Sequence, residues 1–137
     1  MTVSATIKNS FKKHEVFVHT NDTIQHIKIN HKSLGLGSAV NGGELLMLAI
    51  ATCFCNDIYR EAAKRKLEIK SVHVVVSASF ENESEPASNI QYQVKVDSDN
   101  TEAEISKLIK YVDSIAEIHN TIRKGIPVKL GTTYQAY

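Results

Sequence analysis

The feature that most constrains the fold is one helical segment whose apolar run changes abruptly to polar residues. The segment ELLMLAIATCFCNDIYREAA covers residues 44–63 and contains both cysteines of the chain. We predict a helix from about Gly43 to Lys66, roughly 36 Å long. Its first half, through Ala51, is apolar on every side, which is typical of a helix that is buried all round. Its second half is amphipathic and charged.

Alternating apolar residues predict strands on both sides of this helix. The N-terminal third has the pattern of a three-stranded antiparallel meander, with turns at residues 9–10 and 21–22. A glycine-rich loop over residues 31–43 leads into the helix, and loops of this length are often functional. Two further strands are predicted where apolar residues alternate over 72–80 and 90–96.

Two short helices are predicted in the last third of the chain. Thr101 with Glu104, and Ser114 with Glu117, have the spacing of a capping box, in which two residues satisfy the free amides at a helix start. The second helix is expected to end at Gly125, because glycine favours the position that follows a helix.

A final strand over Val128–Tyr134 completes the order βββ-α-ββ-αα-β, an α+β fold in a single domain over residues 1–137. One six-stranded sheet would cover only one side of the long apolar helix. Either the short helices and the glycine-rich loop close the core within a monomer, or a second copy of the chain covers the helix. We favour the second arrangement, a homodimer with the long helices at its centre.

Charge and hydropathy exclude several classes of protein. The chain has 16 Lys and Arg against 15 Asp and Glu, a net charge of +1, which is too little to hold a nucleic acid. The longest apolar run, residues 45–55, is too short for a bilayer, which needs about 20 residues. The N-terminus lacks the apolar segment of a secretory signal peptide. We therefore expect a cytoplasmic protein without nucleic-acid or membrane partners.

The two cysteines, Cys53 and Cys55, are not expected to pair with each other. On a helix, residues i and i+2 project about 200° apart, and disulfide geometry is strict. Cysteines in a chain without a signal peptide are more often reduced than bridged. None of the six histidines has zinc-ligand spacing to a cysteine pair, so we expect no metal site and no cofactor.

Three polar residues follow Cys53 on its own face of the helix, namely Asn56, Asp57 and Arg60 at i+3, i+4 and i+7. A functional interpretation has Arg60 favouring a Cys53 thiolate. The alternative is an ion network at a dimer interface, in which Asp57 and Arg60 satisfy each other. In that case a charged Asp57 close to the thiol would raise its pKa. The residues alone favour the ion network.

The helix and its lead-in resemble the OsmC/Ohr family, the osmotically inducible and organic hydroperoxide resistance proteins. The family has an Asn-Pro-Glu-x-Leu segment before the helix that carries its reactive cysteine. The segment Asn41-Gly42-Gly43-Glu44-Leu45 stands in that place, and Cys53 falls at the cysteine's position. The resemblance implies an intertwined dimer with two long central helices, a sheet on each side and two active sites at the interface.

The resemblance also implies thiol-dependent reduction of organic hydroperoxides, but the chain departs from the family pattern. Family peroxidases use a second cysteine, shortly before a segment that matches Arg123–Val128, to form a disulfide with the oxidised first cysteine. That second position is Ala116 here. A glutamate and an arginine that hold the family's thiolate are also absent, with Gly43 and the turn residues Lys12-Lys13 in their places.

Two hypotheses follow from these observations. In the first, Cys53 has a depressed pKa, forms a sulfenic acid with a hydroperoxide, and is reduced by an external thiol. In the second, the dimer has lost peroxidase activity and binds a small apolar or thiol-bearing ligand at the inter-subunit pocket. The candidate pocket residues are Glu44, Asn56, Asp57, Arg60, His119 and Arg123.

The role of His119 and the source of thiolate activation stay open at this point. His119 lies three residues after Ala116, where it faces the pocket as an acid or ligand donor, or is a half-exposed helix histidine. A cation must activate Cys53, because the helix dipole does not reach ten residues into a helix. The candidate cations are Lys12, Lys13, Arg60 and Arg123.

Overall fold

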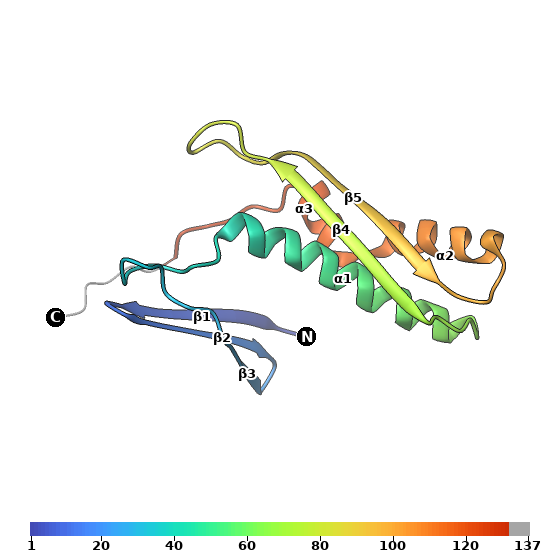
Figure 1. The fold of residues 1–137 in the computed structure, drawn as a ribbon, viewed down its shortest axis with the longest axis horizontal. Helices are drawn as coiled ribbons and strands as arrows, with labels where there is room; N and C mark the ends of the chain where they lie inside the picture. The colour runs from blue at the N-terminus through green and yellow to red at the C-terminus, as the bar shows by residue number, and fades with distance from the viewer. Residues whose placement is uncertain (132–137) are drawn as a thin grey trace. The chain divides into compact units, whose positions relative to one another are not determined.

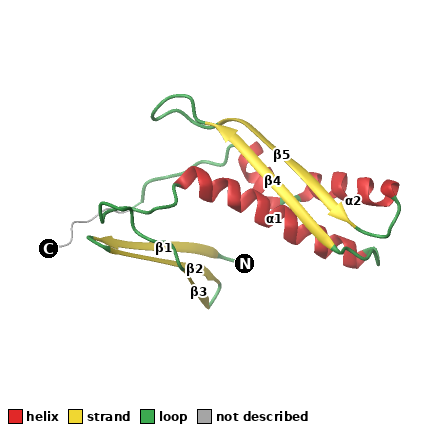
Figure 2. Ribbon diagram, in the orientation of Figure 1, coloured by secondary structure: helices red, strands yellow, loops and turns green. Residues whose placement is uncertain are grey.

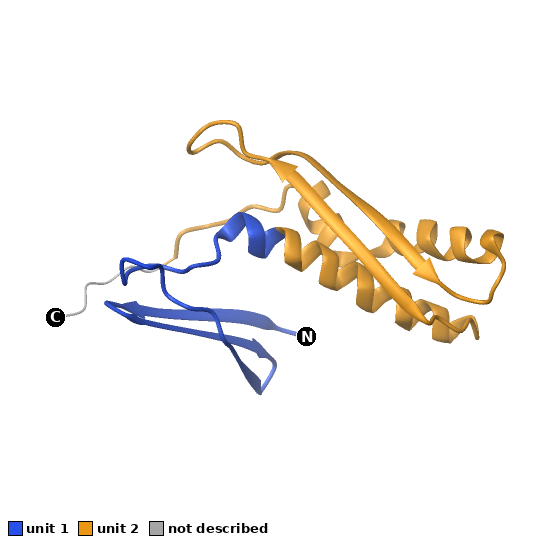
Figure 3. Ribbon diagram, in the orientation of Figure 1, with its two compact units in different colours: residues 1–46 blue, residues 47–137 orange. Residues whose placement is uncertain are grey.

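The computed structural model describes residues 1–131, which fall into two compact units divided after residue 46 (Figure 3). The elements follow the order βββ-α-ββ-αα, which confirms the predicted α+β order as far as the last helix (Figures 1 and 2). The final strand is not formed at residues 128–131, and the rest of its predicted range lies outside the described residues. Among the described residues, no helix is both long and apolar enough to cross a membrane.

The first unit contains the predicted antiparallel meander. Its strands pair in the order β1-β2-β3. The first turn lies at Phe11-Lys12 rather than at residues 9–10, because β1 continues to pair with β2 up to Ser10 opposite Lys13. The second turn lies at residues 21–22, as predicted. The strands are β1 (Val3–Ser10), β2 (Lys13–Thr20) and β3 (Thr23–Ile27).

The glycine-rich loop ends in a cap that starts the long helix α1 (Gly42–Lys64). The Glu44 amide donates to Asn41 Oδ1 at 2.8 Å, and the Asn41 amide donates to Glu44 Oε2 at 2.8 Å. These reciprocal bonds satisfy two amides that a helix start leaves unpaired. Glu44, a candidate pocket residue in the sequence, therefore has a structural role as a cap.

The second unit packs around one face of α1. The core consists of Phe54, Ile58 and Ala62 of α1 with Leu108 and Val112 of the next helix, and all five residues are buried. Partly buried valines of the two strands that lie between these helices in sequence pack against this core. The elements of this unit after α1 are β4 (Ser71–Ser79), β5 (Ser88–Asp97), α2 (Glu102–Ile115) and α3 (Glu117–Arg123).

The predicted six-stranded sheet is wrong for the described residues. Within residues 1–131 the strands form a three-stranded sheet and a separate two-stranded antiparallel sheet, β4-β5. Each strand pairs with its neighbour in sequence across a short connection, and the 23-residue α1 separates the two groups. Within the described residues, both sheets are therefore formed by strands that are neighbours in sequence.

The prediction that α1 is buried all round is not met within one chain. Ile50 and Phe54 are buried, but Leu46 and Leu48 are 36% and 59% exposed. An apolar helix start that one chain leaves open is what the dimer hypothesis requires, and the homodimer stays a prediction.

One of the two predicted capping boxes is confirmed and the other is wrong. Thr101 and Glu104 form the reciprocal bonds that begin α2. Ser114 instead donates its hydroxyl to the carbonyl of Tyr111 at 2.6 Å, and the residue before α3 is Ala116, which has no side-chain cap. The boundary between the two helices is therefore set by the extended backbone of Ala116 rather than by a serine.

Candidate functional site

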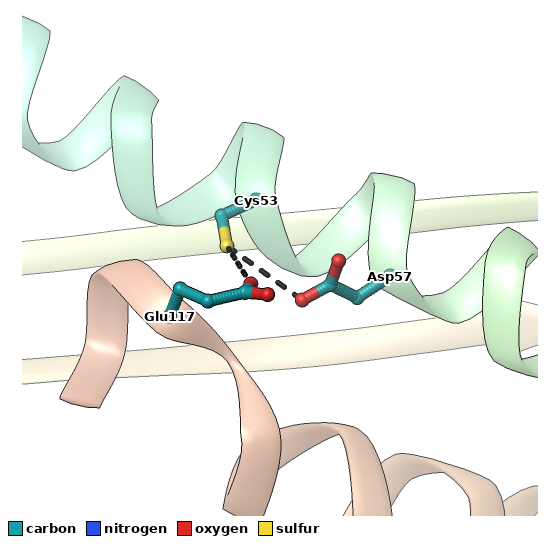
Figure 4. Close-up of side chains that lie close together, drawn as sticks. All are labelled: Cys53, Asp57 and Glu117. Atoms are coloured by element: carbon teal, nitrogen blue, oxygen red, sulfur yellow. Dashed lines mark hydrogen bonds between the residues drawn. The ribbon is translucent and has the colours of Figure 1, made fainter. Parts of the chain in front are cut away.

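Cys53 lies on the side of α1 that α3 approaches, next to two carboxylates (Figure 4). Its thiol donates to Asp57 Oδ2 at 3.7 Å, one helical turn further along α1. Glu117 Oε2, from the first turn of α3, lies 4.0 Å from the same sulfur. We call Cys53, Asp57 and Glu117 the Cys53 site. The site joins residues 64 positions apart in sequence.

The surroundings of Cys53 favour the protonated thiol. Burial raises the pKa of the Cys53 thiol, and the charges of Asp57 and Glu117 raise it further, whereas a hydrogen bond from the Ile118 backbone lowers it. The expectation of a depressed pKa is therefore wrong for the chain as described. The first reason is burial, which disfavours the thiolate, and the second is that both charged groups that reach the sulfur are carboxylates.

Arg60 is directed at carboxylates rather than at the thiol. Its guanidinium lies 2.7 Å from Asp57 Oδ1 and 3.1 Å from Glu61 Oε1. The Asp57–Arg60 pair of the ion-network interpretation is therefore present. Asn56 is exposed and lines a shallow hollow with Cys55, Val72 and Val74, so it is not part of the Cys53 site.

Glu61 forms an ion cluster in the charged second half of α1. Glu61 is buried, and its carboxylate lies within 3.2 Å of cationic groups of Arg60, Lys64 and Arg65. The hydrogen bond from Lys64, together with those from the two arginines, lowers the pKa of Glu61 to about 2. Lys64 and Arg65 follow Glu61 by three and four residues, and this spacing is the sequence feature that indicates ion pairs on a helix.

His119 is buried, and the expectation of a half-exposed helix histidine is wrong. It is 5% exposed and packs against Phe54 and edge-on against Tyr92, with ring centroids 5.7 and 4.9 Å away. Neither ring nitrogen has a hydrogen-bond partner among the described residues. Burial, and then the charge of Arg123, lower the pKa of His119, which favours the neutral ring.

Arg123 and Tyr92 converge on Asp113, a residue that the sequence did not single out. The Arg123 guanidinium donates to Asp113 Oδ1 at 2.7 Å and to the Asp113 carbonyl at 2.8 Å, and the Tyr92 hydroxyl donates to the same carboxylate. Next to this group is a cavity of about 120 Å³. Its walls are formed by Ile50, Ile90, Tyr92, His119, Ile122 and Arg123.

The other candidate cations also have partners of their own. The Lys12 ammonium lies over the Phe11 ring, 5.3 Å from its centroid, and Lys13 lies 3.7 Å from Glu15. Cys55 is half-buried on the side of α1 that faces Val72 and Val74, so the predicted divergence of the two cysteines is confirmed.

The Cys53 site also has donor atoms that suit a metal ion. One sulfur and two carboxylate oxygens lie within 4.8 Å of one another. Zinc accepts both kinds of donor, but a structural zinc site has four protein ligands and this group offers three. Sequence spacing did not indicate this group, because one of its members comes from a distant helix.

Comparison with known proteins identifies the family. The sequence model of the OsmC-like protein family matches residues 35–131. The chain belongs to the OsmC-like family. None of the curated proteins compared with this OsmC-like chain matches it.

Solved structures with low sequence identity share the OsmC fold. A protein from Aquifex aeolicus VF5 is similar with a TM-score of 0.68 and 16% identity, over 90% of this chain and 89% of that one. An OsmC-like protein from Mycoplasma pneumoniae has a TM-score of 0.63 and 17% identity, over 89% and 86%. An organic hydroperoxide resistance protein from Elizabethkingia anophelis has a TM-score of 0.60 and 16% identity, over 90% and 89%.

Proposed function

We propose that this OsmC-like protein is a one-cysteine, thiol-dependent reductase of organic hydroperoxides, with Cys53 as the reacting residue. The observation that supports it best is the hydrogen bond from the Cys53 thiol to Asp57, at the position of the family's reactive cysteine. Cys53 is half-buried rather than fully enclosed. One of the solved structures with the same fold is named as an organic hydroperoxide resistance protein.

The carboxylates determine how such a thiol would react. Burial, and then the charges of Asp57 and Glu117, raise the pKa of the Cys53 thiol, which favours its protonated form. We infer that Asp57 acts as a general base, taking the proton as the sulfur attacks the terminal peroxide oxygen. The O–O bond breaks, the sulfur is oxidised to a sulfenic acid, and the alkoxide leaves with a proton as an alcohol. Preformed thiolate is not needed in this scheme.

An external thiol would complete the cycle. Ala116 occupies the place of the family's second cysteine and is fully buried, so it offers no resolving thiol. A first external thiol condenses with the sulfenic acid, releasing water and forming a mixed disulfide. A second thiol then displaces Cys53 and leaves as the external disulfide. Two equivalents of thiol are therefore consumed for each hydroperoxide.

Peroxide consumption by the purified protein tests this proposal. Cumene hydroperoxide is offered with dithiothreitol, glutathione or dihydrolipoamide as the reductant. Cys53→Ser is expected to abolish consumption, whereas the matched control Cys55→Ser keeps it, because Cys55 lies on the other side of α1. If Cys53→Ser equals the wild type with all three reductants, the thiol is not the reacting group.

A second candidate function has an observation of its own in its favour. The cavity of about 120 Å³ has the buried imidazole of His119 in its wall, and this ring has no hydrogen-bond partner within residues 1–131. Buried polar groups without partners call for an explanation, such as a bound water or ligand. A non-catalytic protein that binds a small apolar molecule with one polar group fits this cavity. The absence of peroxide consumption in the wild type and in Cys53→Ser alike would favour it.

We also propose that the protein is a homodimer and works in the cytoplasm. A second copy would cover the exposed Leu46 and Leu48 of α1, whose apolar side chains gain free energy when removed from water. Two unpaired cysteines suit a reducing compartment. Light scattering at micromolar concentration is expected to give twice the chain mass, and a folded monomer would contradict the dimer.

A further inference from the structure

A hollow in the first unit gathers positively charged and imidazole side chains. It has a volume of about 280 Å³ and lies between the start of β2, the end of β3 and the segment that follows β3. Because the whole chain has a net charge of only +1, this concentration of cations is local. We call it the basic hollow. Its basic residues are Lys12, Lys13, His14, His26, Lys28 and His31.

The lysines of the basic hollow are only partly neutralised. Glu15 lies 3.7 Å from the Lys13 ammonium, and no residue that lines the hollow is acidic. Within residues 1–131, neither Lys12 nor Lys28 forms a salt bridge. The hollow therefore has a positive potential, which attracts small anions.

The hydrogen bonds around His14 determine which of its nitrogens carries the proton. The Gly37 amide donates to Asn9 Oδ1 at 3.0 Å, which orients the Asn9 side-chain amide. Asn9 Nδ2 is then the donor to His14 Nδ1, 2.9 Å away. His14 Nδ1 must accept, so the neutral ring carries its proton on Nε2.

The Nε2–H group of His14 is a hydrogen-bond donor without a protein acceptor. Nε2 is shielded from solvent and has no partner among the described residues. A donor left in this state is unfavourable relative to a paired one. The oxygen of a bound anion would satisfy it, and the long lysine side chains of the hollow can move to admit one.

The turn beside the basic hollow is held in one conformation. Lys12 adopts a left-handed backbone with φ of 59°, and its amide donates to the Gly35 carbonyl at 2.6 Å. Gly35 has φ of 96°, and a Cβ atom there would lie 2.6 Å from the Phe11 ring. Close packing of this kind leaves the turn little freedom. The backbone that carries Lys12 is therefore fixed before a ligand arrives, which reduces the entropy lost on binding.

We propose that the basic hollow binds a phosphate-type dianion, either free or as the terminal group of a small phosphorylated molecule. Lysine ammonium groups suit phosphate as point charges, and an imidazole N–H adds a directed hydrogen bond. A dianion matches the two lysines without carboxylate partners better than a single carboxylate would. The hollow lies within residues 1–46 and uses no residue of the Cys53 site, so this inference does not depend on peroxidase activity.

A binding titration of the full chain at low ionic strength tests this site. Inorganic phosphate and glycerol 3-phosphate are added in turn to isotope-labelled protein, with acetate and chloride as controls. We expect saturable NMR shifts of the His14 and His26 ring signals with the phosphate compounds. Lys28→Gln is expected to weaken phosphate binding about tenfold. The matched control Lys107→Gln removes the same charge from exposed α2 and should change binding less than about twofold.

Each outcome of the titration supports or contradicts the proposed phosphate site. Tighter binding of glycerol 3-phosphate than of phosphate assigns the site to a phosphorylated molecule, and the reverse order assigns it to the free ion. His14→Phe removes the directed donor and should weaken phosphate more than acetate. Equal losses in Lys28→Gln and Lys107→Gln would mean a non-specific charge effect and overturn the proposal. Equal affinity for acetate and phosphate, or no saturable shift, would overturn it as well.

Discussion

Two buried carboxylates, one turn apart on α1, have opposite surroundings. Asp57 and Glu61 are both 3% exposed. Three cationic side chains surround Glu61, whereas Asp57 has one, Arg60, and faces the Cys53 thiol on its other side. A carboxylate with all its partners in place holds a fold together. A carboxylate with a proton donor beside it is placed to exchange that proton.

The largest expected effect is that of substituting Asp57 on the rate of hydroperoxide reduction. Asp57→Asn removes the proposed general base and should lower hydroperoxide reduction by about 100-fold or more. The same substitution removes a charge that raises the pKa of Cys53, so a purely electrostatic role predicts the opposite result, a faster enzyme at pH 7. Steady-state rates, normalised to the folded fraction seen by circular dichroism, separate the two. A faster Asp57→Asn enzyme would contradict the proposal that Asp57 is the general base.

Substitution of Glu61 should lower the stability of the fold and leave the reaction rate unchanged. Glu61→Gln loses its charge-assisted bonds to Lys64, Arg65 and Arg60, so we expect a lower thermal midpoint with the rate per folded molecule unchanged within about twofold. Thermal melts and peroxide assays on the same samples measure both. A loss of activity without a loss of stability would remove the contrast with Asp57.

The contribution of Glu61 to stability should depend on pH. Its pKa falls from an ordinary 4.5 to about 2 in the folded chain. A depressed pKa in the folded state stabilises the fold above the unfolded value, and this stabilisation is lost as pH falls through the folded value. The wild type should therefore exceed Glu61→Gln in stability above about pH 4.5 and converge with it towards pH 2. Urea unfolding at several pH values checks the convergence.

Glu117 should have a smaller effect on the thiol. It is exposed and 4.0 Å from the sulfur, so water screens its charge. In Glu117→Gln the pKa of Cys53 should fall, and alkylation by iodoacetamide at pH 8 should become a few times faster. Wild-type Cys53 should titrate above the value of a free cysteine, about 8.5. A wild-type titration below that value would contradict the described surroundings.

The smallest effect is expected at His119. His119→Phe replaces an unpaired buried imidazole with an apolar ring that can pack on Phe54 and Tyr92. Removing an unsatisfied polar group is neutral or stabilising, by up to about 1 kcal/mol. Urea unfolding measures the change. A clear loss of stability would mean that the ring nitrogens have partners, such as bound water, that the neighbouring side chains do not supply.

The parts of the fold that the sequence predicted best depend on residues close together in the chain. The Thr101–Glu104 cap, the first three strands and the long helix follow from spacing over a few residues, and each is present. The Ser114 cap failed because a serine hydroxyl can bond back to the preceding turn as easily as it can cap the next helix. The six-stranded sheet failed because periodicity predicts strands but does not show which strands pair.

The candidate site was predictable only along α1. Cys53, Asp57 and Arg60 share one helix face, so their proximity and the Asp57–Arg60 pair followed from helical geometry. The second carboxylate did not, because Glu117 reaches Cys53 across 64 residues of chain. The burial of His119 depends on the packing of α3 against Phe54 and Tyr92, and no spacing in the sequence encodes that contact.

By itself the sequence determined the element order as far as α3, the family resemblance and the identity of the cysteine, because these depend on local periodicity and motif. Only the tertiary structure decided the charge state of that cysteine. The pKa of a thiol depends on its burial and on charges within a few ångströms. For Cys53 these are the burial between α1 and α3 and the carboxylates of Asp57 and Glu117, which the fold brings together.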